Sequence, residues 1–205
     1  MVNQVLISML IGYGFGCIQS AYWIGKLVKR IDIREHGSGN AGASNTTTIL
    51  GLKYGILVGL IDILKGMAAV LAVKALFPDN RELAYLAGMM AILGHMFPFY
   101  LKFRGGKGVA TLVGMMAGVD WKLGILFALL VIIPAALTDY IVAGSFGTFL
   151  ALPVVLYTGG YPLVLVMSLV LTVVCFYLHR GNIRRIIDKE ELKISAVLMK
   201  KKNRN

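Results

Sequence analysis

Long apolar runs divide the chain of 205 residues, and they limit its fold more than any other feature. A helix that crosses the hydrocarbon core of a bilayer needs about 20 mostly apolar residues. Runs close to this length lie near residues 5–25, 55–76, 84–101, 123–138, 140–157 and 161–178, and a shorter run lies near 108–119. Since 58% of the residues are hydrophobic and only 15% are charged, the apolar side chains exceed what one soluble core could bury. The sequence therefore predicts an all-α, polytopic membrane protein with about seven transmembrane helices, forming one domain over residues 1–205.

The 21 Lys and Arg residues are gathered in a few connections between the apolar runs. Segment 26–53 holds five of them, segment 102–107 holds three, and the tail after His179 holds nine. The positive-inside rule places such basic connections in the cytoplasm, which puts the amino terminus outside and the carboxyl terminus inside. An odd number of spans agrees with both ends. The net charge of +11 therefore reflects membrane topology, and we expect no nucleic-acid partner.

The first apolar run has the charge order of a retained span. Residues 3–25 carry no charge, and the basic residues follow from Lys26 onward. A signal peptide has its basic residues in front of the apolar run instead. We therefore expect residues 5–25 to remain as the first transmembrane helix.

A pair of oppositely charged residues and both cysteines of the chain lie inside the apolar runs. Asp62 and Lys65 are three residues apart, so they share a helix face and can pair with each other instead of facing lipid. A structural ion pair and a functional site explain this pattern equally well. Cys17 and Cys175 are far apart in sequence and lack the spacing of metal ligands, so we interpret both as packing residues and predict no metal site.

The first basic connection, REHGSGNAGASNTTTILG at 34–51, is rich in glycine and in short polar side chains. Glycine lets backbone amides approach an anion, and hydroxyl and amide side chains donate hydrogen bonds to it. A flexible loop of turn-forming residues has the same composition. Taken by itself, this segment favours the flexible loop.

The second basic connection, KFRGGKGVAT at 102–111, places three glycines and Lys107 directly before an apolar run. Backbone amides in the first turn of a helix, together with the Lys107 ammonium, can hold a phosphate. The segment is not a Walker A loop, because no Ser or Thr directly follows Lys107 and the glycine spacing differs, which disfavours a nucleotidase. The alternative is a positively charged anchor with a glycine hinge.

The third basic connection, HRGNIRRIIDKEELKI at 179–194, follows the last apolar run without a gap. If the helix continues, His179 and Asn182 lie on one face, where they can hydrogen-bond a hydroxyl or a phosphate. The alternative is a basic amphipathic tail on anionic lipid. Residues 195–205, which end in KKKNRN, are predicted to be such a tail and to be disordered.

The three anion-friendly segments fall on the same side of the membrane by an independent argument from charge. This coincidence favours a phosphate site assembled from all three. Two classes of function fit such a site. One is an enzyme that acts on phosphorylated substrates, and the other is a transporter or a lipid- or anion-binding membrane protein without catalytic activity.

Three stretches of sequence also resemble a known family. HGSGNAGASN, GHMFPFYLKFRGGKGVAT and HRGNIRR are similar to the three motifs of the acyl-phosphate-dependent glycerol-3-phosphate acyltransferases of bacteria, the PlsY family. The resemblance implies a seven-helix fold in the bacterial plasma membrane with its active site on the cytoplasmic side. It implies that acyl phosphate and glycerol 3-phosphate are the substrates, and that lysophosphatidic acid and phosphate are the products. It implies that membrane lipid surrounds the protein and that the reaction needs no cofactor, and it leaves the oligomeric state open.

The resemblance also assigns roles by motif position. It implies a catalytic group of four residues, namely Ser38, Lys107, His179 and Asn182. It implies a substrate-binding group that comprises Gly37, Gly39, Asn40, Gly42, Ser44, Asn45, Gly105, Gly106, Gly108 and Glu191. Acyl phosphate has a good leaving group, so positioning and charge stabilisation serve better than a covalent nucleophile. The HxxxxD motif of other acyltransferases is missing, so either His179 or the substrate's own phosphate is the general base.

The chain departs from the family pattern at three positions. Thr48 stands where the family usually has Arg, which is the better bidentate ligand for phosphate. Gln19 stands where Pro is typical, and this concerns the shape of the first helix. Lys189 replaces a usual Gly, so either Glu191 or Glu190 can be aligned with the family's acidic residue.

Overall fold

The computed structural model describes residues 1–196, and every regular element in that range is helical. The α-helices are α1 (Val2–Gly16), α2 (Ser20–Lys29), α3 (Ala43–Leu50), α4 (Leu52–Leu76), α5 (Arg81–Met96), α6 (Val109–Val119), α7 (Trp121–Thr138), α8 (Ile141–Thr158) and α9 (Pro162–Ile187). Short 3-10 turns lie at Ile33–Glu35 and Phe99–Leu101. The prediction of an all-α fold is confirmed.

Within residues 1–196, six stretches are long and apolar enough to cross a membrane. They are Val2–Lys29, Leu52–Leu76, Arg81–Leu101, Trp121–Thr138, Ile141–Thr158 and Val164–Ile187. They coincide with the six long runs of the sequence, and the shorter run forms α6, of 11 residues. The chain is an integral membrane protein, and a seventh crossing through α6 remains a prediction.

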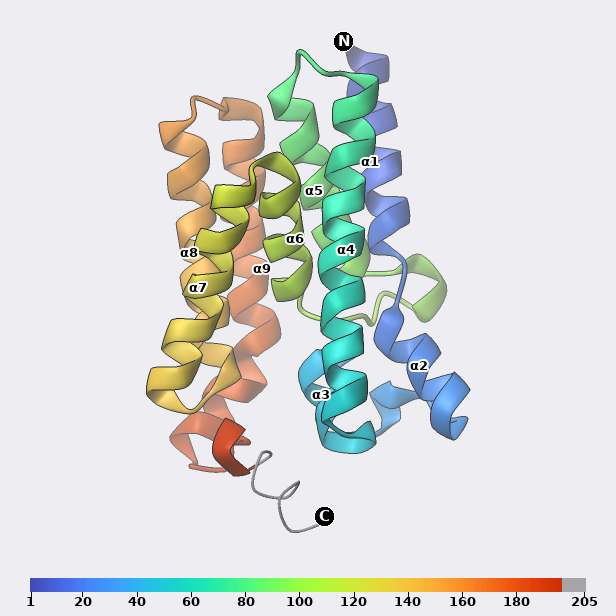
Figure 1. Ribbon diagram of the computed structural model, residues 1–205, viewed down its shortest axis with the longest axis vertical. Coiled ribbons are helices and arrows are strands. Elements are labelled where there is room, and N and C mark those ends of the chain that lie inside the picture. The colour runs from blue at the N-terminus through green and yellow to red at the C-terminus, as the bar shows by residue number, and fades with distance from the viewer. Residues whose placement is uncertain (197–205) are drawn as a thin grey trace.

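The long helices run alternately down and up the bundle (Figure 1). The amino terminus lies at the upper end, whereas α2, α3 and the end of α9 lie at the lower end. The connection between α5 and α6 enters the bundle well above that end, and α6 begins there. The first turn of α6 is thus placed inside the bundle, above the level of α2 and α3.

Close packing of small residues fixes α6 against α4. Gly66 lies against the Thr111 carbonyl and Gly114 lies against the Ile63 carbonyl, so a Cβ atom at either glycine would collide with the facing backbone. Glycine at such contacts lets membrane helices approach each other closely. Lys74 donates to the last carbonyls of α6 at 3.1 and 3.2 Å. The depth of α6 in the bundle is therefore set by backbone contacts.

A break separates α1 from α2 although no proline is present there. The side-chain amide of Gln19 donates to the carbonyls of Gly16, Gly94 and His95, at 3.3, 3.3 and 3.1 Å. The last carbonyls of a helix have no partner within that helix, and an unpaired carbonyl is costly inside a membrane. The Gln19 amide satisfies such carbonyls at the end of α1 and near the end of α5. The expectation that position 19 concerns helix shape agrees with this geometry.

The end of the described chain returns to the α7–α8 connection. Ser195 donates to the Asp139 carboxylate from its amide at 2.8 Å and from its hydroxyl at 2.5 Å. The Ile194 amide donates to the Asp139 carbonyl at 2.9 Å. Residue 195 therefore has fixed partners, and the disorder predicted for 197–205 lies outside the described residues.

Candidate active site

The loop before α3 is folded around the side chain of Asn45. Its Oδ1 atom accepts a hydrogen bond from the Ser38 amide at 2.9 Å, and its Nδ2 atom donates to the carbonyls of Ile33 and His36 at 3.0 Å each. Gly37 lies against the Asn45 oxygen with a φ of +60°, a conformation that favours glycine. Asn45 therefore positions the loop that carries Ser38.

Hydrogen bonds join this first loop to the second basic connection. One guanidinium nitrogen of Arg34 donates to the carbonyls of Leu101 and Arg104, at 2.8 and 3.2 Å. The Ala41 amide donates to the Gly105 carbonyl at 3.4 Å. Hydrogen bonds thus hold together two segments that lie about 65 residues apart in sequence.

The glycines of the second connection are seated directly on the end of α5. The Gly105 amide donates to the Met96 carbonyl and the Gly106 amide donates to the His95 carbonyl, both at 3.0 Å. A Cβ atom at Gly105 would collide with the α5 backbone, and one at Gly106 would collide with the His95 ring. Gly108, with a φ of +79°, then starts α6. Only glycine allows this close contact with the end of α5, and the contact directs Lys107 toward α9.

Lys107 meets the third basic connection at Asn182. The Lys107 ammonium donates to Asn182 Oδ1, and Asn182 Nδ2 donates to a Glu191 carboxylate oxygen at 2.6 Å. The Arg185 guanidinium donates to the other Glu191 oxygen at 2.7 Å. Glu190 is exposed and makes no such contact. The geometry therefore places Glu191, not Glu190, beside the predicted site.

His179 lies one helical turn before Asn182 and is buried. Its Nδ1 atom is 2.8 Å from the Cys175 carbonyl, which can only accept a hydrogen bond, so the network assigns the ring proton to Nδ1. The Nε2 atom of neutral His179 is then left with a lone pair. His179 is thus suited to accept a proton or a hydrogen bond.

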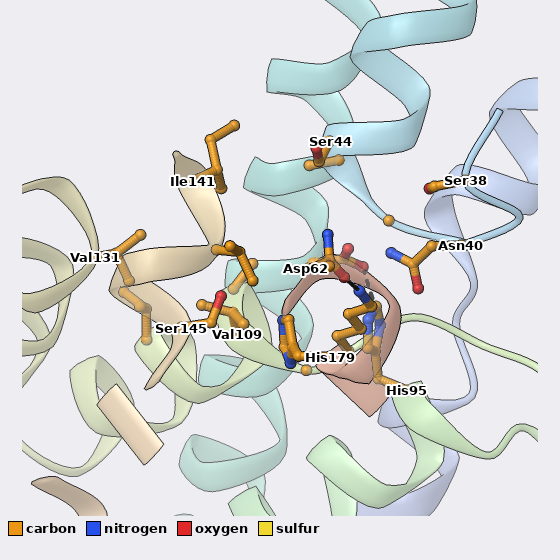
Figure 2. Close-up of a pocket in the computed structure, with 18 of the residues that line it drawn as sticks. Ser38, Asn40, Ser44, Asp62, His95, Val109, Val131, Ile141, Ser145 and His179 are labelled. Atoms are coloured by element: carbon orange, nitrogen blue, oxygen red, sulfur yellow. Dashed lines mark hydrogen bonds and ion pairs between the residues drawn. The ribbon is translucent and has the colours of Figure 1, made fainter. Parts of the chain in front are cut away.

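The three segments surround a first cavity of about 330 Å³ (Figure 2). Polar side chains from all three segments line this cavity, namely Ser38, Asn40, Ser44, Lys107, His179 and Asn182. Apolar side chains of α6, α7 and α8 also line it, including Val109, Val113, Val131, Ile132, Ile141 and Val142. In Figure 2, Val131 and Ile141 lie on the side away from Ser38 and Asn40. The first cavity can therefore hold an amphiphile with a polar head.

A second cavity, of about 420 Å³, adjoins the first. Ser38, Asn40, Lys107 and Asn182 line both cavities. The second cavity is also lined by basic side chains, which are Arg104, Arg180 and Arg185. Arginine side chains are well suited to bind a phosphate, because the guanidinium group can donate two parallel hydrogen bonds. Lys107 stands at the junction between the two cavities.

Burial lowers the pKa of the Lys107 ammonium to about 8, and the charge of Arg185 acts in the same direction. Glu191 opposes this shift because its carboxylate favours the charged amine. An anion bound beside Lys107 would favour the ammonium in the same way. The amine is therefore poised to gain charge when an anionic ligand enters.

Most residues assigned by motif line one of the two cavities. Those that do are Ser38, Gly39, Asn40, Gly42, Ser44, Gly105, Gly106, Lys107, Gly108, His179, Asn182 and Glu191. Gly37 and Asn45 line neither cavity and support the first loop instead, so their predicted contact with substrate remains a prediction. No metal-binding group of three His, Cys, Asp or Glu residues is found within residues 1–196.

Sequence reasoning did not include several cavity residues. Asp62 and His95 line the first cavity, and Arg104, Arg180 and Arg185 line the second. The sequence left open whether Asp62 has a structural or a functional role. Arg104 and Arg185 were counted as markers of topology, and charge alone does not separate a ligand-binding arginine from an anchor.

An all-α membrane protein with an amphiphile-shaped cavity beside a cationic one belongs to the class of membrane-embedded enzymes that act on lipid phosphates. A family model described as glycerol-3-phosphate acyltransferase matches residues 6–189. The chain belongs to the glycerol-3-phosphate acyltransferase family, and it is an acyltransferase.

Relatives and solved structures match over nearly the full chain. Glycerol-3-phosphate acyltransferase 1 of Oceanobacillus iheyensis is 39% identical, over 96% of this chain and 98% of the relative. Glycerol-3-phosphate acyltransferase of Brucella anthropi is 35% identical, over 92% of each chain. The crystal structure of PlsY (YgiH), an integral membrane glycerol 3-phosphate acyltransferase, in its glycerol 3-phosphate form is 34% identical. That structure has a TM-score of 0.82 and covers 93% of this chain and 95% of its own.

We expect Lys107 to make substrate binding depend on pH. Its pKa of about 8 means that the ammonium is present below pH 8 and is lost above it, so the KM for a phosphorylated substrate should rise between pH 7 and pH 9. A phosphate monoester, with a second pKa of about 6, keeps its charge over this range. Steady-state kinetics at each pH measures the effect.

Two variants complete this test. Lys107→Arg keeps its charge and should flatten the pH profile, whereas Lys107→Ala should lose roughly 10²–10³ in turnover, as removal of one preorganised charge-stabilising donor does. Near-normal turnover by a folded Lys107→Ala variant would leave Lys107 as a topological anchor only.

Proposed function

We propose that the chain transfers a fatty acyl group from acyl phosphate to the 1-hydroxyl of sn-glycerol 3-phosphate, giving lysophosphatidic acid and inorganic phosphate. The observation that carries this proposal is the position of Lys107 at the junction of the two cavities. A reaction between an amphiphile and a small phosphorylated alcohol needs such a junction, because the reacting atoms of both substrates must meet there.

The first cavity fits an acyl phosphate. Its apolar end between Val131 and Ile141 can receive the acyl chain, and its polar end places Lys107 and Ser38 near the phosphate. The acyl carbon of this mixed anhydride is already activated. The site therefore has to neutralise the phosphate and orient the carbonyl, and it has no need of an acyl-enzyme intermediate.

The second cavity fits glycerol 3-phosphate. Arg104, Arg180 and Arg185 can neutralise its phosphate while its free hydroxyls point toward Lys107. When the 1-hydroxyl attacks the acyl carbon, its proton must leave. The unprotonated Nε2 atom of His179 is one acceptor, and the substrate's own phosphate is the other. The solved PlsY structures include a glycerol 3-phosphate form and a lysophosphatidic acid form, which supports this pairing of substrate and product.

The choice of acyl donor can be measured with purified protein in lipid. We expect radiolabelled glycerol 3-phosphate to be converted to lysophosphatidic acid with palmitoyl phosphate, and much more slowly with palmitoyl-CoA, because the thioester has no phosphate on its acyl carbon for Lys107 to neutralise. Lys107→Ala is the matched negative control. Equal rates with palmitoyl-CoA, which is a thioester, would contradict the proposal that acyl phosphate is the specific donor.

A membrane protein that only binds an anion is the competing interpretation. It predicts that phosphate binds but that no donor yields lysophosphatidic acid. The buried Asp62–Lys65 pair does not by itself favour this interpretation, because the two groups are bonded to each other at 2.8 Å. Absence of product with every donor, in protein that still binds phosphate, would favour it.

Thr48 generates a prediction about affinity for glycerol 3-phosphate. Thr48 is exposed on α3 and its hydroxyl donates to the carbonyl of Ser44, a cavity residue one turn earlier. Thr48→Arg should lower the KM for glycerol 3-phosphate, by up to roughly the 1.5–3 kcal/mol of a hydrogen bond to a charged group. The KM for acyl phosphate should change much less, and glycerol, which has no phosphate, should gain nothing. Initial rates with each substrate varied in turn measure the difference.

An unchanged KM for glycerol 3-phosphate in Thr48→Arg protein would indicate that another basic residue already binds the phosphate of this substrate. Arg34, Lys53 and Arg180 are the candidates near the first and third segments. Of these three, Arg180 lines the second cavity. Its guanidinium also donates to the Tyr177 carbonyl at 2.8 Å, and that of Arg34 donates to the carbonyls of Leu101 and Arg104. Arg180→Gln should then raise the KM for glycerol 3-phosphate in the parent protein.

We also propose that the site faces the cytoplasm of a bacterial plasma membrane. The first and third basic segments lie at the lower end of the bundle (Figure 1), and Arg34 joins the second segment to the first through the carbonyls of Leu101 and Arg104. The positive-inside rule places such basic connections in the cytoplasm. A cysteine at exposed Asp79 should react with an impermeant maleimide added to intact cells, whereas a cysteine at exposed Glu35 should react only after lysis. Cys17 and Cys175 are buried and give a low background. Labelling of Glu35→Cys from outside would reverse the orientation.

A further inference from the structure

A buried polar cluster joins α2, α4 and α5 beside the first cavity. Its members are Ser20, Asp62, Lys65 and His95, and the side chains of Asp62 and Lys65 are only 2% and 1% exposed. Asp62 and His95 line the first cavity, and Figure 2 shows both at its wall. The reaction described above assigns no part to this cluster.

The three protons of the Lys65 ammonium have three acceptors. They are Asp62 Oδ1 at 2.8 Å, the Ile18 carbonyl at 2.6 Å and His95 Nδ1 at 2.7 Å. Lys65 lies against a carboxylate that also accepts a hydrogen bond from the Ser20 hydroxyl at 2.8 Å, and an ammonium with three protons satisfies all three acceptors around Nζ. An ammonium has donors and no acceptor, and therefore His95 Nδ1 must accept. The proton of neutral His95 is then on Nε2.

The Nε2 atom of His95 is directed at the glycine-rich connection. A Cβ atom built on Gly106 would collide with Nε2, so this atom lies directly under the backbone that precedes Lys107. The Gly106 amide and the Gln19 side chain both donate to the His95 carbonyl, at 3.0 and 3.1 Å, which fixes the backbone as well. No side chain or carbonyl within residues 1–196 is bonded to Nε2. His95 is one of the residues that line the first cavity.

We propose that the Nε2–H group of His95 donates a hydrogen bond to a phosphate oxygen of the ligand in the first cavity, and that Lys65 and Asp62 are positioning residues that hold His95 in this tautomer. This inference rests on the proposed function for the identity of the ligand, which is acyl phosphate. His95 lines the first cavity and not the second, so the donor phosphate is its partner. His95 and Lys107 would thus approach the same phosphate from two sides.

Imidazole ¹⁵N spectroscopy tests the tautomer without reference to turnover. The sequence holds three histidines, so the resonances of His95 are assigned by comparison with His95→Gln protein. We expect neutral His95 with its proton on Nε2, and a shift of its Nε2 resonance when inorganic phosphate is added. In Lys65→Met protein the proton should be shared between the two ring nitrogens. A proton on Nδ1 in the parent, or an Nε2 resonance that ignores saturating phosphate, would overturn the proposal.

Kinetics with paired substitutions separates donation from packing. His95→Gln keeps an amide donor near the Nε2 position and His95→Leu removes it. We expect His95→Leu to lose about 100-fold in kcat/KM for acyl phosphate, in line with the loss of one preorganised donor, and His95→Gln to recover at least tenfold of that loss. The KM for glycerol 3-phosphate should change little in either variant. Equal losses in both variants at equal thermal stability would make His95 a packing residue and contradict the proposal.

The two measurements also separate this inference from the proposed function. A phosphate-dependent shift of His95 in a protein that forms no lysophosphatidic acid would support the binding role and reject the acyltransferase reaction. Normal acyl transfer with palmitoyl phosphate by His95→Leu protein would support the reaction and reject the role of His95.

Discussion

The two hydrogen bonds that seat Gly105 and Gly106 on the carbonyls of Met96 and His95 determine most of the site. They fold the chain back onto the end of α5, so that α6 begins inside the bundle. Lys107 is thereby directed at Asn182, and the first-turn amides of α6 face the space below. A side chain at either glycine would collide with α5, and therefore this seat can form only with glycine.

The depth of α6 has an energetic consequence for the charges around it. A cation partly removed from water loses solvation, as the lowered pKa of Lys107 shows, and it regains stabilisation when an anion enters. Lys107 lines the first cavity together with apolar side chains, and a charge in such low-dielectric surroundings attracts a phosphate more strongly than it does in water. In the proposed reaction, binding of the acyl chain and neutralisation of the phosphate would therefore support each other.

The sequence predicted the helices and the three polar segments, because apolar length and basic connections are local properties. It did not distinguish Asn45, which holds the first loop, from Asn40, which lines the cavities. Both are polar residues in one glycine-rich stretch, and only the tertiary fold decides which of them lines a cavity and which of them supports the loop. The place of His95 was missed for a related reason, since a lone histidine in an apolar run indicates neither its partners nor its direction.

The two cavity histidines have opposite proton positions for physical reasons. The Cys175 carbonyl can only accept, so His179 is protonated at Nδ1 and keeps an acceptor at Nε2. The Lys65 ammonium can only donate, so His95 accepts at Nδ1 and keeps a donor at Nε2. One site thus presents both a proton acceptor and a proton donor from the same residue type. The hydrogen bond at Nδ1, not the local sequence, decides whether Nε2 of each ring can accept or donate a proton.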